Sequence, residues 1–209
     1  MNRGMFITFE GGDGSGKSTQ IEILQGALEA MELEVLVTRE PGGTKISENI
    51  RSLLLDPDNS EMSPKTEMLL YAAARAQLVD QVIRPALDEG KVVICDRFLD
   101  SSIAYQAYGR GLGDSVETVN GPAVEECMPD ITFFLEIDPE KAGDRIADRG
   151  EEKDRIERED DGFRKRVAQG YSELADKYPD RIVRIDATGS VEEIAVRIID
   201  KAMTRIYER

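Results

Sequence analysis

The chain has 209 residues, of which 40% are hydrophobic, and its net charge is −15 at pH 7. This length and apolar content suffice for one domain with a sizeable core, so we expect residues 1–209 to form a single domain. The acidic charge disfavours non-specific binding to nucleic acid or to an anionic membrane, and an anionic substrate would need a local cluster of cations. A saline cytoplasm and an ordinary solvated surface both explain the acidic excess.

The chain contains no histidine and two cysteines, Cys95 and Cys127. The lack of histidine excludes Ser-His-Asp and Cys-His catalysis and disfavours a zinc site. Cys95 lies in an apolar run, which favours a buried, unreactive thiol. The apolar runs are too short to span a bilayer, and the first residues do not resemble a signal peptide. We therefore expect a cytoplasmic enzyme that binds neither nucleic acid nor a membrane.

Five short apolar runs along the chain have the composition of buried strands. They are residues 5–9, 34–38, 92–95, 131–137 and 182–185. The amphipathic stretches between them predict helices at 17–32, 45–55, 65–89, 139–148, 157–177 and 192–207. Asp138 with Pro139, and Ser190 with Glu193, are typical of helix starts. Because strands and helices alternate, the sequence predicts a doubly wound α/β domain with a parallel sheet, whose ligands bind at the carboxyl ends of the strands.

The first apolar run leads into a glycine-rich loop with the pattern Gly-x-x-x-x-Gly-Lys-Ser. Its residues are Gly11, Gly12, Asp13, Gly14, Ser15, Gly16, Lys17, Ser18 and Thr19. The glycines let successive backbone N–H groups converge on a polyphosphate. We expect Lys17, as an exposed cation, to reach the outer phosphates, Ser18 to bind Mg²⁺, and the following helix to direct its N-terminus at the same anion. A chance glycine-rich turn is the alternative, which the strand before the loop and the helix after it disfavour.

Charged side chains also follow the second and third apolar runs. Arg39-Glu40-Pro41-Gly42-Gly43 follows the second run, and Asp96-Arg97-Phe98 ends the third. Asp96 suits a magnesium-bound water, and Arg97 suits a phosphate. An Asp-Arg pair alone would also fit a surface ion pair, but matching chemistry at two strand ends favours a site.

These segments together resemble the thymidylate kinases, which transfer the terminal phosphate of ATP to dTMP for dTTP biosynthesis. The resemblance runs from about Gly4 to about Tyr178. Its marks are residues 11–19, Thr38-Arg-Glu-Pro-Gly-Gly-Thr44, Ile50-Arg-Ser-Leu-Leu-Leu55, Leu69-Leu-Tyr-Ala-Ala-Ala-Arg75, Asp96-Arg-Phe-Leu-Asp-Ser-Ser-Ile-Ala-Tyr-Gln106 and Asp154-Arg-Ile-Glu157. It implies a P-loop kinase fold with sheet order 2-3-1-4-5, a small lid at about 145–158, ATP as co-substrate, Mg²⁺ dependence and a homodimer.

The resemblance also implies roles for individual residues at the acceptor site. Arg97 and Arg51 would hold the acceptor phosphate, with Arg39 as a further candidate. At the base, Arg75 would reach a thymine carbonyl, Tyr71 would stack on the ring, and Ser102 and Gln106 would meet its edge. Tyr105 would leave little room for a ribose 2′-hydroxyl, and Asp13 and Glu40 would meet the sugar hydroxyl or the metal shell. The family's turn at this place also implies a cis peptide bond between Glu40 and Pro41.

Some of these residues have simpler interpretations. Tyr71 stands where the family usually has Phe, so its hydroxyl needs a partner. The alternative is that the ring belongs to the core, which Arg75 at i+4 on the same helix face disfavours. Ser102 and Gln106 could lie on a solvated helix.

The implied mechanism needs no general base, because the second pKa of a phosphate monoester is about 6 and the acceptor is already largely a dianion. Lys17, Arg97 and Asp13 would form the catalytic centre together with a lid arginine, since the phosphate loop lacks an arginine of its own. Arg149 is the first candidate and Arg155 the second, while Arg145 fits a helix surface or a contact near the adenine. A solvated acidic loop is the alternative for this segment.

Two other classes of protein use the same kind of phosphate loop. A kinase for another nucleotide or nucleoside would share both the loop and the Asp-Arg pair. A regulatory GTPase would also need an Asn-Lys-x-Asp guanine-binding motif, which the sequence lacks.

Overall fold

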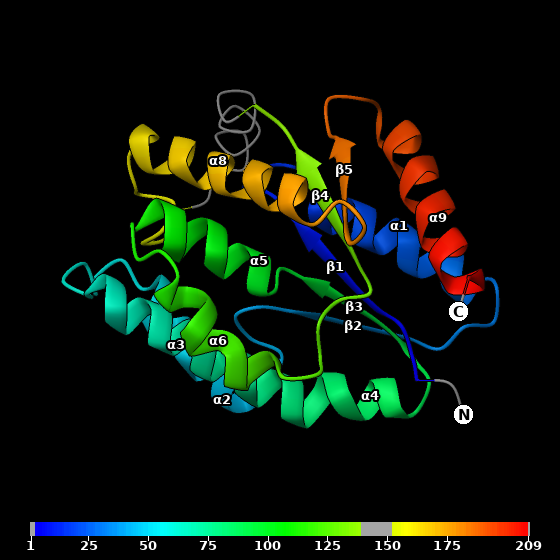
Figure 1. Ribbon diagram of the computed structural model, residues 1–209, viewed down its shortest axis with the longest axis horizontal. Coiled ribbons are helices and arrows are strands. Elements are labelled where there is room, and N and C mark those ends of the chain that lie inside the picture. The colour runs from blue at the N-terminus through cyan, green and yellow to red at the C-terminus, as the bar shows by residue number, and fades with distance from the viewer. Residues whose placement is uncertain (1–2, 139–151, 209) are drawn as a thin grey trace.

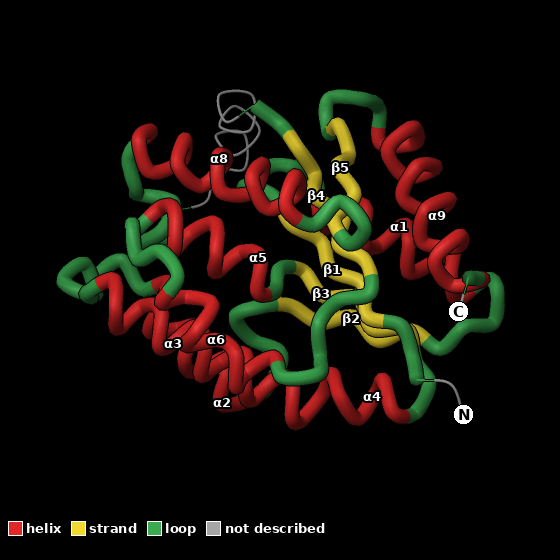
Figure 2. Tube along the Cα trace, viewed as in Figure 1, coloured by secondary structure: helices red, strands yellow, loops and turns green. Residues whose placement is uncertain are grey.

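The structure, a computed structural model, describes residues 3–138 and 152–208. A central parallel sheet is covered by helices on both faces (Figures 1 and 2). Helices α1 (Lys17–Glu29) and α9 (Val191–Tyr207) pack on one face. The other face is covered by helices that include α3 (Pro64–Leu78), α6 (Ser115–Val124) and α8 (Asp161–Lys177). The described part of the chain contains no helix long and apolar enough to cross a membrane.

The sheet has five strands in the order β2-β3-β1-β4-β5, and every neighbouring pair is parallel. The strands are β1 (Phe6–Glu10), β2 (Val35–Arg39), β3 (Val92–Asp96), β4 (Ile131–Glu136) and β5 (Ile182–Asp186). Both the predicted doubly wound topology and the predicted strand order are confirmed. Glu10, Arg39 and Asp96 belong to the ends of their strands, because backbone pairing continues one residue past each apolar run.

Burial of the strands depends on their place in the sheet. The central strand β1 is buried along its whole length, as predicted for a strand covered on both faces. The prediction is wrong for β2 and β5, which form the two edges of the sheet and are only partly buried. Cys95 on β3 is buried as expected, and burial raises the pKa of its thiol.

Most helices begin and end close to the predicted residues. Helix α2 (Lys45–Leu55) has the predicted bounds, and α9 begins with the predicted capping box between Ser190 and Glu193. Helix α1 ends three residues early, and α8 begins late because the Asp160 side chain accepts from Phe163 N at 2.7 Å and caps it. The predicted helix at 139–148 lies outside the described residues.

The predicted helix at 65–89 is confirmed as one helical segment with an irregular turn. Helix α3 continues through a π-helical stretch, Val79–Ile83, into α4 (Arg84–Asp88). Pro85 has no N–H and its ring would crowd the carbonyl four residues earlier, so a wider turn before it relieves the conflict.

Two helical segments of the structure have no counterpart among the predicted helices. Helix α5 (Leu99–Ser102) runs into a second π-helical stretch, Ile103–Gly109, and α6 was not predicted. Glycines at 109, 111 and 113 and Pro122 inside α6 weaken the local helix signal. Tertiary packing of α6 on α3 offsets this weak propensity.

Candidate active site

The phosphate loop has the backbone geometry that its glycines allow. Gly11 has a φ of 138°, and a Cβ there would lie 2.6 Å from the Leu135 carbonyl oxygen. Gly16, with a φ of 92°, directly precedes α1, and no side chain caps the first turn of this helix. The N–H groups of that turn are therefore left for an anion, and Ser18 and Thr19 are exposed beside them.

Lys17 lies against the loop rather than in solvent. It is only 7% exposed, and its Nζ donates to the carbonyl oxygens of Gly11 at 3.2 Å and Gly12 at 3.0 Å. Burial, followed by the nearby charge of Arg97, lowers the pKa of Lys17 to about 8. The expectation of an exposed cation is therefore wrong, because the loop folds around the ammonium group.

The predicted magnesium ligands fit a hydrated ion. Asp96 ends β3 next to the loop, and its Oδ1 is buried without a hydrogen-bond donor among the described residues. The structure's described part contains no group of three or more acidic or cysteine side chains that could enclose a metal. One carboxylate, the Ser18 hydroxyl and nucleotide phosphates suit Mg²⁺, which keeps several waters in such sites.

Arg97 joins the phosphate loop to the neighbouring helices. Its backbone has a φ of 69°, an uncommon conformation for a residue other than glycine. Its guanidinium donates to Asp13 Oδ1 at 2.7 Å, to Tyr171 Oη at 3.1 Å and to Ser101 Oγ at 3.2 Å. It also stacks over the Tyr105 ring, 5.3 Å from the centroid. Arg97 is thus held in one orientation beside the loop.

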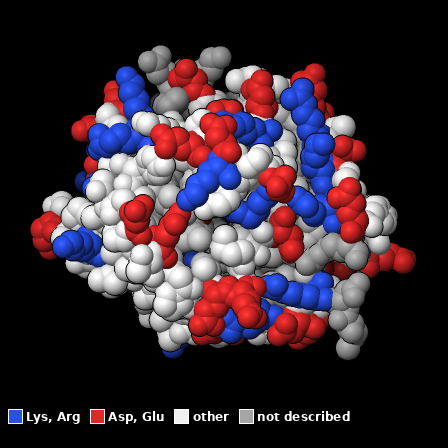
Figure 3. All heavy atoms as spheres, in the orientation of Figure 1, with Lys and Arg blue, Asp and Glu red and all other residues white. Residues whose placement is uncertain are grey.

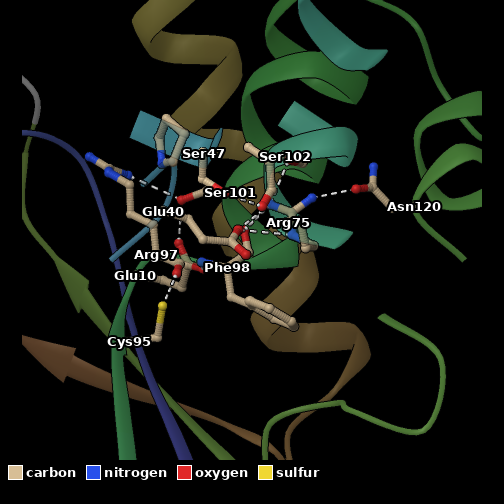
Figure 4. A network of polar contacts seen from close by, with 12 residues as sticks. Glu10, Glu40, Ser47, Arg75, Cys95, Arg97, Phe98, Ser101, Ser102 and Asn120 are labelled. Atoms are coloured by element: carbon tan, nitrogen blue, oxygen red, sulfur yellow. Dashed lines mark hydrogen bonds and ion pairs between the residues drawn. The ribbon is translucent and has the colours of Figure 1, made fainter. Parts of the chain in front are cut away.

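Glu10 supports this arrangement from below (Figure 4). Its carboxylate is fully buried and accepts from Phe98 N at 2.7 Å, from Ser101 Oγ and from Tyr171 Oη at 3.0 Å. Burial raises the pKa of Glu10 to about 7. Ser101 and Tyr171 therefore bridge Glu10 and Arg97. These supporting residues were not predicted from the sequence. Glu10 could have been found as a carboxylate closing a buried strand, but Tyr171 is distant in the chain and gave no signal.

A cavity opens beside Arg97 and the phosphate loop. Its walls are formed by Asp13, Glu40, Pro41, Arg51, Leu55, Tyr71, Arg75, Arg97, Phe98, Ser101, Ser102, Tyr105, Gln106, Asp154 and Ile156. Every residue predicted for the acceptor site lies here except Arg39. Apolar and aromatic walls with a few convergent polar groups are typical of a small-molecule site.

Arg39 points away from the cavity. It is exposed and forms an ion pair with Glu48, with N–O distances of 2.9 Å to both oxygens. Successive side chains of a strand point to opposite faces, so a residue next to the inward-facing Glu40 points outward. The structure thus does not bring Arg39 to the predicted site.

Arg75 and Glu40 form a buried pair in the cavity wall (Figure 4). Arg75 Nε donates to Glu40 Oε2 at 2.9 Å, and Nη2 donates at 3.0 Å to both Phe98 O and Ser102 Oγ. Nη1 bonds to Asn120 Oδ1, so every nitrogen of Arg75 already has a protein partner. Glu40 Oε1 is buried without a donor among the described residues, and burial raises the pKa of Glu40 to about 7. The predicted cis peptide between Glu40 and Pro41 is confirmed.

Tyr71 and Tyr105 supply aromatic surface to the cavity. Tyr71 is partly buried, and the partner that its hydroxyl was predicted to need is not found in the described part of the chain. The Tyr105 ring packs edge-on against Phe163, with centroids 6.0 Å apart, and against Tyr171 at 6.3 Å.

Arg155 is not placed as a lid cation would be. It is buried, its Nε donates to Leu54 O at 2.8 Å, and its Nη2 lies 2.7 Å from Glu67 Oε2. These contacts anchor its segment to α2 and α3, so the prediction of Arg155 as the second lid candidate is wrong. Arg145 and Arg149 lie outside the described residues.

On the outer face shown in Figure 3, acidic and basic side chains are interspersed. Lys17 in the loop and Arg51 and Arg97 in the cavity wall are cations that could hold an anionic ligand.

Comparisons with known proteins agree on one family. The model of the thymidylate kinase family matches residues 9–198. The chain is 50% identical over 206 residues to a thymidylate kinase of an Exiguobacterium species, covering 98% of this chain and 97% of the relative. It is 49% identical over 209 residues to the thymidylate kinase of Lactobacillus helveticus, covering 99% of both chains. The crystal structure of thymidylate kinase from Ehrlichia chaffeensis is similar with a TM-score of 0.77 and 33% identity, covering 96% of this chain and 99% of that one.

Proposed function

The chain belongs to the thymidylate kinase family, and on this premise we propose that it transfers the terminal phosphate of ATP to dTMP, giving dTDP and ADP. The observation that best supports this is the cavity beside the phosphate loop. It combines two cations, Arg51 and Arg97, with the aromatic ring of Tyr71 and the buried amide of Gln106. Such a cavity suits a pyrimidine nucleotide whose phosphate points at the loop.

In this proposal the acceptor lies along the cavity with its phosphate on Arg97 and Arg51. Thymine stacks on Tyr71, and Gln106 and Ser102 meet the edge of the base. Tyr105 lies beneath the sugar, while Asp13 and the unpaired Glu40 oxygen meet the sugar hydroxyl. Arg75 orients Glu40 and Ser102, and the second hydrogen of its Nη1 group remains to reach a thymine carbonyl.

The reaction requires positioning and charge neutralisation rather than a base. The dianionic acceptor is the nucleophile, and an in-line approach of two anions is possible only when cations offset their repulsion. Residues 11–19 hold the ATP phosphates, and Lys17 and Arg97 supply positive charge on either side of the moving group. Ser18, and Asp96 through water, would hold Mg²⁺, which when bound offsets negative charge on the phosphates. We assign the remaining cations to Arg149 and Arg145 in a lid that begins at about residue 145.

We also propose that the protein is a homodimer in the cytoplasm. Ile46 and Leu53, one heptad apart on α2, are 54% and 52% exposed, and Leu69 on the adjoining α3 is 55% exposed. Apolar side chains that share an exposed helix face favour contact with another protein surface, and a second copy of the chain is the simplest partner.

Variants of Tyr71 test the proposed base site. Base stacking on an aromatic ring is worth about 1–3 kcal/mol, so Tyr71→Ala should raise KM for dTMP by about tenfold to a hundredfold. Tyr71→Phe keeps the ring and is the matched control, with a KM close to that of the parent protein. A coupled ADP-release assay measures both. An unchanged KM for dTMP in Tyr71→Ala would show that the base does not stack on Tyr71.

A further inference from the structure

Behind the cavity, Glu67 forms a buried charge cluster that the proposed mechanism does not use. Glu67 lies on α3, one turn before Tyr71, and is 0% exposed. Arg110 donates to it from Nε at 3.1 Å and from Nη2 at 2.9 Å, and Arg155 Nη2 lies 2.7 Å away. Glu67 does not line the cavity, but Gln106 does, and Gln106 Nε2 donates to Glu67 Oε1 at 2.9 Å.

Glu67 is ionised in this setting. Burial acts to raise its pKa, but the hydrogen bonds and charge of Arg110, with help from Gln106 and Arg155, outweigh burial and lower the pKa of Glu67. An ionised carboxylate has no hydrogen to donate, so it accepts at both oxygens.

This fixes which way round the Gln106 amide lies. Oxygen and nitrogen of a glutamine amide have nearly the same shape, and only their partners distinguish them. A partner that can only accept requires the nitrogen, so the NH₂ group of Gln106 must face Glu67. The side-chain carbonyl oxygen of Gln106 then points away from Glu67, and no described residue donates to it.

We propose that Glu67 is a positioning residue that keeps the side-chain carbonyl oxygen of Gln106 toward the cavity, so that the base subsite selects a pyrimidine with a ring N–H over cytosine. The inference rests on the proposed function, which places the base against Gln106. Thymine presents the N3–H donor that a carbonyl oxygen can accept. Cytosine presents an unprotonated N3 there, so two acceptors would face each other. With the amide reversed, the preference would also reverse.

The test compares kcat/KM for dTMP and for dCMP in the full-length protein. Glu67→Gln gives Gln106 a partner that can donate or accept, so both amide orientations become possible. We expect the dTMP-to-dCMP ratio to fall by about tenfold or more, with most of the change in KM. In a Gln106→Ala background the same substitution should leave the ratio unchanged, because the group through which Glu67 acts is missing.

Two further variants separate positioning from general stability. Glu159→Gln changes another carboxylate that pairs with Arg110 but does not contact Gln106, and it should keep the parent ratio. Glu67→Asp keeps the charge next to Arg110 and Arg155 but shortens the reach to Gln106, so it should lower the ratio even if Glu67→Gln fails to fold.

The outcomes tell a failure of the Glu67 positioning role from a failure of the proposed base site. If Glu67→Gln and Glu67→Asp keep the parent ratio, or lower it equally in the Gln106→Ala background, the positioning role is refuted while the base site stands. If Gln106→Ala alone leaves the ratio unchanged, the base does not meet Gln106, and the proposed base site fails together with the inference.

Discussion

Replacing Lys17 with Met tests two separate effects of this residue, its contribution to the rate of phosphoryl transfer and its effect on the free energy of unfolding. Lys17 is buried in the phosphate loop, and burial is the main reason that its pKa falls from 10.5 to about 8. At neutral pH the side chain is therefore charged in a place that disfavours the charge, and a shift of this size corresponds to about 3 kcal/mol. Methionine fills a similar volume without charge, so Lys17→Met should remove this penalty.

The sign of the pH dependence follows from the two pKa values. Between about pH 8 and pH 10.5 the unfolded chain holds the Lys17 proton more tightly than the folded protein does, so the parent protein gains stability as the pH rises. The methionine side chain of the variant does not titrate. The free energy of unfolding of the variant minus that of the parent should thus fall by about 2 kcal/mol from about pH 6.5 to about pH 9.5. The variant also loses the two hydrogen bonds that Lys17 donates to Gly11 and Gly12. This loss lowers the free energy of unfolding of the variant by about 1 kcal/mol for each bond, to the same extent at both pH values.

Urea denaturation of both proteins at the two pH values measures this difference, and the ADP-release assay measures the activity. We expect phosphoryl transfer to fall by orders of magnitude in the variant, since Lys17 offsets charge on the moving phosphate. A stability difference that does not change with pH would refute the desolvation of Lys17. Retained activity would refute its assignment to the phosphate site.

Three further predictions concern the acceptor, the lid and the assembly. Arg97→Lys should lower kcat/KM for dTMP by about a hundredfold, because an ammonium group cannot replace the forked contacts of the guanidinium. Arg39→Lys is the control and should leave kcat/KM unchanged. Steady-state kinetics of both variants measure these values. Arg149→Ala should lower kcat far more than it raises KM for dTMP, and an unchanged kcat would remove Arg149 from the reaction. Ile46→Glu combined with Leu53→Glu should convert a dimer into a monomer in sedimentation equilibrium, and an unaltered dimer would place the interface elsewhere.

Much of the fold could be predicted because the sheet is parallel and central. Apolar runs marked all five strands, and the strand order came from the resemblance to a family rather than from the runs themselves. The exceptions arise where local pattern and tertiary context differ. β2 has the composition of a buried strand but lies at an edge, and α6 carries Pro122 yet is helical because it packs on α3.

The site could be predicted where chemistry follows the end of a strand. The carboxyl ends of parallel strands meet at one edge, which brings the phosphate loop, Glu40 and Arg97 together. What the sequence could not give is the direction of a side chain and its distant partners. Arg39 faces outward, and the contacts of Tyr171 and Arg155 join segments far apart in the chain.

The most direct test of the proposed function is the rate of ADP release with ATP and each nucleoside monophosphate in turn. We expect the highest kcat/KM with dTMP, because the proposed base site pairs thymine with the Tyr71 ring and the side-chain carbonyl oxygen of Gln106. We expect low values with ribonucleotides, because the proposal puts the sugar against Tyr105, which lines the cavity. Faster turnover with CMP, AMP or GMP than with dTMP would contradict the proposed function.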